Sequence, residues 1–246
     1  MEQAEYELMN AVEDGMWWYR GAHANALALY RSFRPTGAPA RGAALDAGCG
    51  TGGLLRKLAQ APDLPAVYGL DYSQSAARLA HDKSRCPVTV GTVNALPFGD
   101  ESLAAIFSMD VLCHRAADQE TALREAYRSL KHGGSLVINL PAYQWMHSVH
   151  DERVHNARRY TRSQAIGLLR AAGFQEIHAS YWNMLLFPLM MLRRKLLPAS
   201  DESDVRLYPA LIESLFRGIL TLERGLLRRG FRLPFGGSIM AVAIKH

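Results

Sequence analysis

The sequence is poor in cysteine, has no long apolar run and carries no large excess of charge, and each absence excludes a class of protein. Its three cysteines, Cys49, Cys86 and Cys113, are an odd number at wide spacing. This pattern argues against a disulfide framework and a Cys-x-x-Cys metal site and favours a reducing compartment. No uninterrupted apolar segment is long enough to predict a membrane span, and Met1–Asp14 is acidic and polar, unlike a signal peptide. We therefore expect a cytoplasmic protein.

The overall charge and composition are those of an ordinary globular domain. The net charge of +5 and the isoelectric point near 9.2 are mild and do not by themselves indicate a nucleic-acid partner. With 49% hydrophobic and 21% charged residues, the 246 residues suit one α/β domain with an appended cap.

One stretch of the sequence carries the strongest pattern. Residues 43–53 read AALDAGCGTGG, in which an apolar run ends in Asp46 and glycines follow at positions 48, 50, 52 and 53. Residues 54–60 then favour a helix. A buried strand, a tight glycine turn and a helix form the first βα unit of a doubly wound sheet, where such folds hold nucleotides.

The acid before the glycine turn discriminates between nucleotide classes. Gly48, Gly50 and Gly53 satisfy the pattern G-x-G-x-x-G, so the motif itself permits a dinucleotide. Asp46 would repel a nearby pyrophosphate, whereas it would attract an ammonium or sulfonium group. S-adenosylmethionine (SAM) carries both cations and no phosphate, so the charge pattern favours SAM.

Residues 45–52, LDAGCGTG, resemble the first motif of class I SAM-dependent methyltransferases. The resemblance extends over about residues 43–182 and the last ten. It implies a Rossmann-like, doubly wound α/β fold with a seven-stranded sheet whose last strand is antiparallel. It also implies SAM as the cofactor, with its methionine part held by the loop that contains Asp46, Gly48, Cys49, Gly50 and Gly52.

Further positions follow the same resemblance. Asp71 ends the second predicted strand 23 residues after Gly48, where an acid accepts hydrogen bonds from both ribose hydroxyls, and Tyr72 would lie against adenine. Asn94 and Ala95 occupy the adenine loop, with Asn94 where the family commonly has Asp. Met109 ends the fourth predicted strand beside the same ligand.

Residues 1–41 precede the first strand and are expected to form an N-terminal helical cap on a methyltransferase domain at 42–246. A helix is predicted from Trp17 to about Phe33, followed by a loop at 35–39. Two adjacent tryptophans cannot both face one core, so this helix is a candidate lid. Tyr19 and Arg20 are candidates for binding the cofactor carboxylate, with ordinary packing as the alternative.

The segment at 141–160 is long for a connection inside a compact domain, which favours a functional role. His150 or His155 would supply a general base to the acceptor, and His114, just past the fourth strand, is a third candidate. In the structural alternative, the Arg-Arg-Tyr cluster at 158–160 and a His–Asp pair hold this segment to the sheet. No metal site is predicted, because His150, Asp151 and His155 do not share a helical face.

Other strands are expected at 65–71, 87–92, 103–109, 135–140, 175–181 and 237–245. Capping residues predict helix starts after Ser73, Asp118 and Thr161, and Gly133-Gly134 is expected to end the second of these helices.

A helical insertion is predicted at about 183–232. Residues 183–197 are apolar except for three basic residues at 193–195, and residues 209–229 have the spacing of an amphipathic helix. Its apolar stripe would pack on the core, cover an amphipathic acceptor or contact an anionic lipid surface. These alternatives leave peripheral contact with the inner membrane face open, and no oligomeric state is predicted.

The sequence therefore predicts transfer of a methyl group from SAM to an oxygen or nitrogen of a small or amphipathic acceptor, lipid-linked or secondary-metabolite in type. One alternative is an RNA methyltransferase, which the basic isoelectric point supports although no RNA-binding module is visible. Another is a nicotinamide-dependent oxidoreductase, which the glycine pattern permits. A third is a subunit that binds SAM without catalysis.

Overall fold

The computed structural model describes residues 3–36, 42–64, 66–196 and 205–246. Parts of some predicted segments lie outside the described residues: positions 37–39 of the loop at 35–39, Pro65, and the polar segment at 201–204. Within them, seven strands form one sheet in the order β3-β2-β1-β4-β5-β7-β6. The strands are β1 (Ala43–Ala47), β2 (Ala66–Asp71), β3 (Val88–Val90), β4 (Leu103–Met109), β5 (Leu130–Pro141), β6 (Glu176–Trp182) and β7 (Ser238–Ile244).

The strand directions confirm the predicted fold class. β1 to β5 are parallel neighbours, whereas β7 runs antiparallel to both β5 and β6. From the central β1 the chain moves first outward to β2 and β3, then back across to β4. The carboxyl ends of β1 and β4 therefore form a topological switch point, where open α/β sheets bind their ligands.

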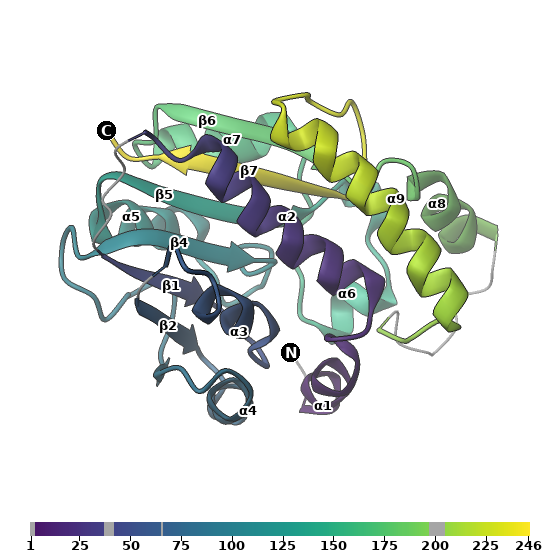
Figure 1. The fold of residues 1–246 in the computed structure, drawn as a ribbon, viewed down its shortest axis with the longest axis horizontal. Helices are drawn as coiled ribbons and strands as arrows, with labels where there is room; N and C mark the ends of the chain where they lie inside the picture. The colour runs from purple at the N-terminus through teal and green to yellow at the C-terminus, as the bar shows by residue number, and fades with distance from the viewer. Residues whose placement is uncertain (1–2, 37–41, 65, 197–204) are drawn as a thin grey trace.

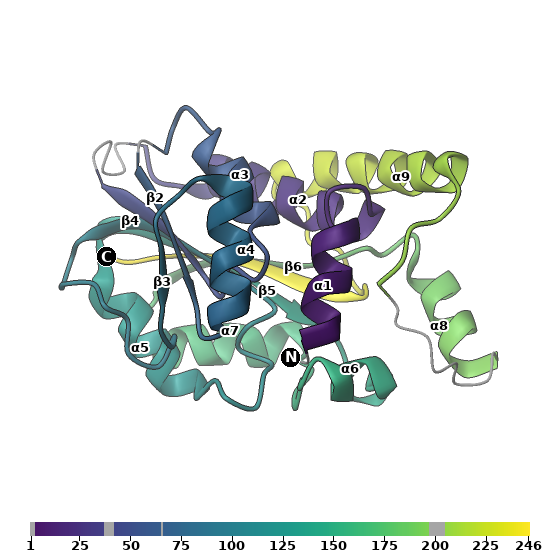
Figure 2. The ribbon, with the colours of Figure 1, turned by 90° about the horizontal axis from the view of Figure 1, so that it is seen from below.

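Helices cover both faces of the sheet. α2, α3 and α9 lie on one face, and α5 and α7 lie on the other (Figure 1, Figure 2). The described helices are α1 (Gln3–Val12), α2 (Trp17–Phe33), α3 (Gly53–Ala59), α4 (Gln74–Ser84), α5 (Gln119–Ser129), α6 (Val149–Arg153), α7 (Arg162–Ala171), α8 (Phe187–Leu196) and α9 (Ala210–Arg228), with a short 3-10 turn at Gln144–Met146. None of them combines the length and the apolar character needed to cross a bilayer.

The predicted capping residues start the helices as expected. The side chain of Ser73 accepts a hydrogen bond from the backbone of α4, and that of Asp118 does the same for α5. Thr161 and Gln164 form a reciprocal capping box at the start of α7. Each cap satisfies backbone donors that have no partner inside the helix.

The expectation for Gly133-Gly134 is wrong. α5 ends at Ser129, and β5 begins at once with Leu130. Gly133 lies inside the strand with φ of 74° and donates a hydrogen bond to the Lys245 carbonyl at 2.7 Å. The pairing of β4 with β5 shifts register at this point. The glycines therefore build a bulge, which places extra residues in a strand, and do not terminate the helix.

The two ends of the chain are joined where α2 and α9 cross. A Cβ on Gly21 of α2 would lie 2.3 Å from the Leu220 side chain of α9, so the helices approach closely because residue 21 is glycine. The Glu213 carboxylate of α9 accepts a hydrogen bond from the Trp17 backbone at 2.6 Å, which caps α2. The N-terminal helix and the late insertion therefore form one wall.

Candidate functional site

The glycine turn after β1 is folded back onto β2. The backbone N–H groups of Gly48 and Cys49 both donate to the Leu70 carbonyl, at 2.7 and 3.0 Å. Gly48 has φ of 83°, and a Cβ there would lie 2.3 Å from the Val111 side chain. Glycine is therefore needed at this position both for the backbone conformation and for the close approach.

Asp46 presents a carboxylate to the switch point in an unusual state. Its side chain is 1% exposed, and within the described part of the chain its Oδ2 atom has no hydrogen-bond partner. Burial, with the nearby Asp71 and Glu13, raises the pKa of Asp46 to about 8. A buried carboxylate oxygen without a donor is costly. A ligand that carries an ammonium or sulfonium group fits this position, whereas a pyrophosphate does not.

Asp71, at the end of β2, holds the glycine turn in place. Its two carboxylate oxygens accept hydrogen bonds from the backbone of Gly50 and of Ser73, each at 2.9 Å. Burial raises the pKa of Asp71 in spite of these donors. Each oxygen retains a lone pair, so the carboxylate can also accept hydrogen bonds from ligand hydroxyls. Tyr72, which follows, is exposed at the edge of the cavity.

A cavity of about 520 Å³ opens at this edge of the sheet. Most of the predicted cofactor and catalytic residues meet around it, although they come from the N-terminal helices, three strand ends and the segment at 141–160. Those that line it are Tyr19, Asp46, Gly48, Cys49, Gly50, Asp71, Tyr72, Met109, His114, His150 and His155. Four predicted residues do not line it: Arg20, Gly52, Asn94 and Ala95.

Asn94 holds a loop and does not face the cavity. Its amide nitrogen donates to the Ala116 carbonyl at 2.9 Å, and its amide oxygen accepts from the Asp118 backbone at 3.0 Å. The residues just before it, Thr92 and Val93, line the cavity in its place. Asn94 therefore fixes the backbone that presents these two residues.

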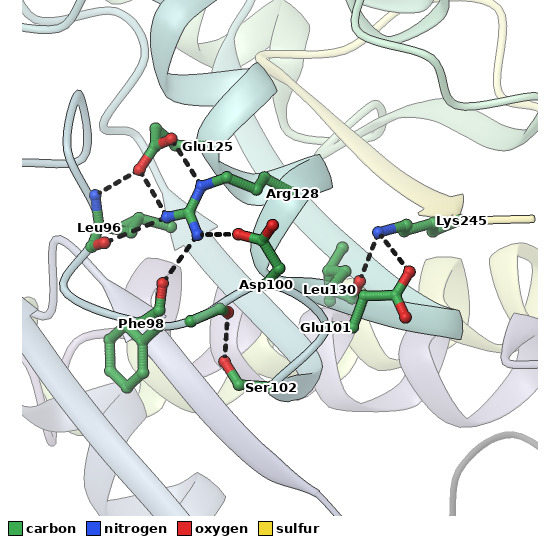
Figure 3. A network of polar contacts seen from close by, with 10 residues as sticks. Leu96, Phe98, Asp100, Glu101, Ser102, Glu125, Arg128, Leu130 and Lys245 are labelled. Atoms are coloured by element: carbon green, nitrogen blue, oxygen red, sulfur yellow. Dashed lines mark hydrogen bonds and ion pairs between the residues drawn. The ribbon is translucent and has the colours of Figure 1, made fainter.

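The far side of the same loop is fastened to α5. The guanidinium of Arg128 contacts Glu125, Asp100 and the Leu96 and Phe98 carbonyls (Figure 3). The pKa of Glu125 is lowered, chiefly by its hydrogen bond to Arg128. This network sets the position of the loop from outside the cavity.

α1 covers the cavity as part of the N-terminal segment that was expected to form a cap, although no helix was predicted at Gln3–Val12. Tyr6, Met9 and Glu13 line the cavity from this segment. The buried Glu13 carboxylate accepts a hydrogen bond from the Thr51 hydroxyl at 2.5 Å and pairs with Lys83 of α4. These contacts clamp the end of α1 to the glycine turn. Glu13 is one of five acids among the first fourteen residues, and nothing in the sequence distinguishes it from the others.

The segment at 141–160 is more ordered than a loop. It contains the 3-10 turn and α6, which begins with a capping box between Ser148 and Asp151. Asp151 is fully buried and pairs with Arg159 at 2.8 Å, so this pair attaches the segment to itself. The predicted attachment to the sheet comes from the other two members of the cluster. Arg158 donates to backbone carbonyls in the residues that follow β4, and the Tyr160 hydroxyl donates to the Leu112 carbonyl at 2.8 Å.

The three predicted histidines line the cavity in different environments. His150 lies on α6, and His155 follows that helix with φ of 58°. Burial lowers the pKa of His114 to about 4. His114 is therefore neutral near pH 7 and is a weak base.

A second carboxyl group, on the half-buried Asp110 just after β4, lines the cavity. The amide nitrogen of Asn139 lies 3.0 Å from both Asp110 carboxylate oxygens and donates to them. The amide oxygen of Asn139 in turn accepts a hydrogen bond from the Trp182 indole at 2.7 Å. Burial raises the pKa of Asp110 to about 7, with Asn139 and Arg159 opposing. The chain Trp182–Asn139–Asp110 thus orients a carboxyl group poised to exchange a proton near neutral pH.

Comparison with known proteins agrees with this geometry. Residues 45–138, from β1 into β5, match the family described as Methyltransferase domain. The chain therefore contains a methyltransferase domain at residues 45–138. Its recognition from the LDAGCGTG motif is confirmed, and so are SAM and methyl transfer as the cofactor and reaction typical of this domain family. The nicotinamide oxidoreductase that the glycine pattern permitted is correspondingly disfavoured.

Relatives of the methyltransferase domain are diverse. A 24-methylenesterol C-methyltransferase 2 of Oryza sativa subsp. japonica is 33% identical over 131 residues, which are 47% of this chain and 34% of that protein. The chain spans about a third of the length of the curated relatives it matches first.

Solved structures share the fold over nearly the whole chain. A SAM-dependent methyltransferase of Thermotoga maritima, described as a possible histamine N-methyltransferase, has a TM-score of 0.59 and 22% identity, covering 99% of this chain and 95% of that one. Phosphoethanolamine N-methyltransferase 2 of Haemonchus contortus, solved with SAM, has a TM-score of 0.58 and 18% identity, covering 90% and 52% of the two chains.

Proposed function

We propose that the protein transfers the methyl group of SAM to an oxygen or nitrogen atom of a small or amphipathic acceptor. The observation that carries this proposal is the buried Asp46 oxygen, which has no hydrogen-bond partner within the described residues and belongs to a carboxyl group that lines the cavity. The cationic methionine part of SAM would supply the missing donor. A phosphorylated ligand would meet three acids there, because Asp71 and Glu13 lie nearby.

The donor half of the cavity would be formed by the methyltransferase domain, which we take as residues 42–246, with residues 1–41 as its cap. Asp71 would accept hydrogen bonds from the ribose hydroxyls, and Tyr72 would lie against the adenine. The glycine turn from Gly48 to Gly52 would surround the methionine part, with Met109 beside it and Tyr19 approaching from the cap. Arg20 is exposed and outside the cavity, so we assign it no direct contact with SAM.

The other half of the cavity suits an acceptor with an apolar portion. Side chains from α8, the segment before α9, and α9 itself line it: Leu186, Leu189, Met190, Val205 and Phe216. The sterol methyltransferase among the relatives is consistent with an apolar acceptor.

SAM is an activated methyl donor, so holding the acceptor atom in line with the methyl carbon supplies much of the acceleration. A base is needed only where the acceptor must lose a proton. We propose Asp110 for this role, together with the earlier candidates His150 and His155. The pKa of Asp110 is about 7, close to the value that favours proton transfer at neutral pH. His114 is less suited, because its pKa is far lower.

The test is incubation of the purified protein with methyl-labelled SAM and fractionated host extract. The expected result is label in a lipid or polar-metabolite fraction. Asp71→Asn should lower this labelling through weaker SAM binding, and Asp110→Asn should lower it while SAM affinity in calorimetry is kept. Label in RNA would favour the RNA methyltransferase instead. SAM binding with no labelled product in any fraction would indicate a binding subunit and overturn the proposal.

A further inference from the structure

The outer face of α9 is apolar although it faces solvent. Leu211, Leu215, Leu222 and Leu226 follow one another at helical spacing, and Leu211 is 86% and Leu222 is 70% exposed. A helix on the surface of a soluble domain usually buries its apolar side chains and presents polar ones outward. The inner face of α9 packs on α2 through Leu220, and the outer face carries this second apolar stripe.

The acids of α9 are turned inward. Glu213 and Glu223 are its only acidic residues, and both are buried. Glu213 accepts a hydrogen bond from the Trp17 backbone at 2.6 Å, and Glu223 accepts one from the Leu185 backbone at 2.7 Å. Both carboxylates are therefore used by backbone donors inside the fold. The charges that α9 presents outward belong to arginines.

Arg217, Arg224 and Arg228 line one edge of the exposed arc, seven and four residues apart, and the leucines line the other edge. Burial and the neighbouring Arg228 lower the pKa of Arg224, as expected for cations gathered together. Small residues occupy the middle of the arc between the two edges: Ser214, Gly218, Thr221 and Gly225. A helix of this form can lie close to a flat surface with both edges in contact.

The surface continues beyond the helix. Phe231 is exposed just after α9, with Arg229 and Arg232 around it in the sequence. α8, which also carries exposed leucines, lies at the same end of the molecule (Figure 1, Figure 2). Leu189 of α8 and Phe216 of α9 line the cavity as well. The helix with the apolar outer edge is therefore also a wall of the site.

We propose that this surface, the α9 face, docks on an anionic phospholipid bilayer. The leucine edge and Phe231 enter the interface, and the long arginine side chains reach the lipid phosphates. Charge complementarity selects this occupant over a second copy of the chain, because two α9 faces would bring cations together with no outward acid on either helix. The α9 face would bind lipid whether or not the protein transfers methyl groups.

The test is co-sedimentation of the full chain with vesicles of phosphatidylcholine alone and of phosphatidylcholine with 30% phosphatidylglycerol. We expect binding to the anionic vesicles that weakens in 0.5 M NaCl. Leu211→Asp with Leu222→Asp should abolish it. Arg224→Gln with Arg228→Gln should weaken it by roughly thirtyfold, from about 1 kcal/mol for each cation near the surface.

The matched control is Arg78→Gln with Arg170→Gln, which removes two exposed arginines from α4 and α7 and should keep vesicle binding. Far-ultraviolet circular dichroism checks that each variant is folded. If the wild-type chain stays in the supernatant with anionic vesicles, the proposal is wrong, and self-association that the leucine variants disrupt would then assign the face to a second copy. Equal losses in the control and α9 arginine variants would also overturn it.

Discussion

At the scale of single residues, Asp46 makes stability depend on pH in a direction opposite to most acids. Burial raises its pKa in the folded chain to about 8, above the value of 3.8 expected when it is exposed. Between about pH 4 and pH 8, the folded chain holds a proton that the unfolded chain has released. Without a ligand, this group therefore costs stability as the pH rises through that window, and the cost is complete above the folded pKa.

Asp46→Asn should accordingly stabilise the ligand-free protein, compared with wild type, more at pH 8.5 than at pH 5. The difference between the two pH values is on the order of 2–4 kcal/mol, because the amide is neutral throughout. Denaturant unfolding followed by circular dichroism measures it.

Asp63→Asn is the control for the pH dependence. The pKa of Asp63 is lowered, chiefly by its hydrogen bond to Arg31, so Asp63 is ionised at both pH values and this variant should lose about the same stability at pH 5 as at pH 8.5. An Asp46→Asn effect that is the same at both pH values would contradict the assignment of the shift to burial.

The residue roles that could be predicted are those written locally in the sequence. Asp46 and Asp71 follow strands at the spacing that the fold requires, and both line the cavity. The role of Asn94 depends on the Ala116 carbonyl and the Asp118 N–H, which arrive from more than twenty residues away. Asp110 is oriented by Asn139 and Trp182 from two other strands. No local pattern contains such contacts.

At the scale of secondary-structure elements, α1 is held over the cavity by contacts that include those of Glu13, the residue that follows it. Glu13 pairs with Lys83 and accepts from Thr51, and a Cβ on Gly53 would collide with it at 2.2 Å. The helix has ten residues, too short to be stable alone. Its position therefore depends on this clamp and on the packing of Tyr6 and Met9.

Glu13→Gln should speed the dissociation of SAM several-fold and change its association rate less, because a loosened α1 releases the ligand more often. Stopped-flow fluorescence of SAM binding measures both rates. Glu7→Gln on the exposed side of the same helix is the control, because the Glu7 carboxylate accepts a hydrogen bond from Gln3 of the same helix and does not line the cavity. Unchanged dissociation in Glu13→Gln would mean that α1 does not close the site.

Several elements were predicted closely, among them α2, β4 and the helices whose starts are set by local caps. α4, α5 and α7 begin where Ser73, Asp118 and Thr161 indicated. The start of β5 was missed, because its bulge at Gly133 is stabilised by Lys245 at the far end of the chain. α1 was missed because its stability comes from distant residues and not from its own sequence.

At the scale of the whole molecule, the crossing of α2 and α9 joins the first thirty residues to the last forty. Gly21→Ala should destabilise the protein by about 1–3 kcal/mol, because the added methyl group would lie 2.3 Å from the buried Leu220 side chain. Thermal unfolding measures the change.

Gly218→Ala on α9 is the matched control. No atom lies within 4 Å of its added Cβ, so the usual helix preference for alanine should stabilise the protein by roughly 0.5–1 kcal/mol. If both variants gained stability, the close contact between the helices would be refuted.

The segments joined at this crossing lie outside the part of the chain that matches the methyltransferase family. The segment shared with the methyltransferase family ends at residue 138, whereas the apolar lining of the cavity comes largely from the chain's two extremities. The acceptor specificity can therefore change during evolution while the residues that bind the methyl donor stay the same. Chimeras that exchange both terminal segments together should acquire the acceptor preference of the protein that supplied them. Chimeras that exchange only one terminal segment should lose the contact between α2 and α9.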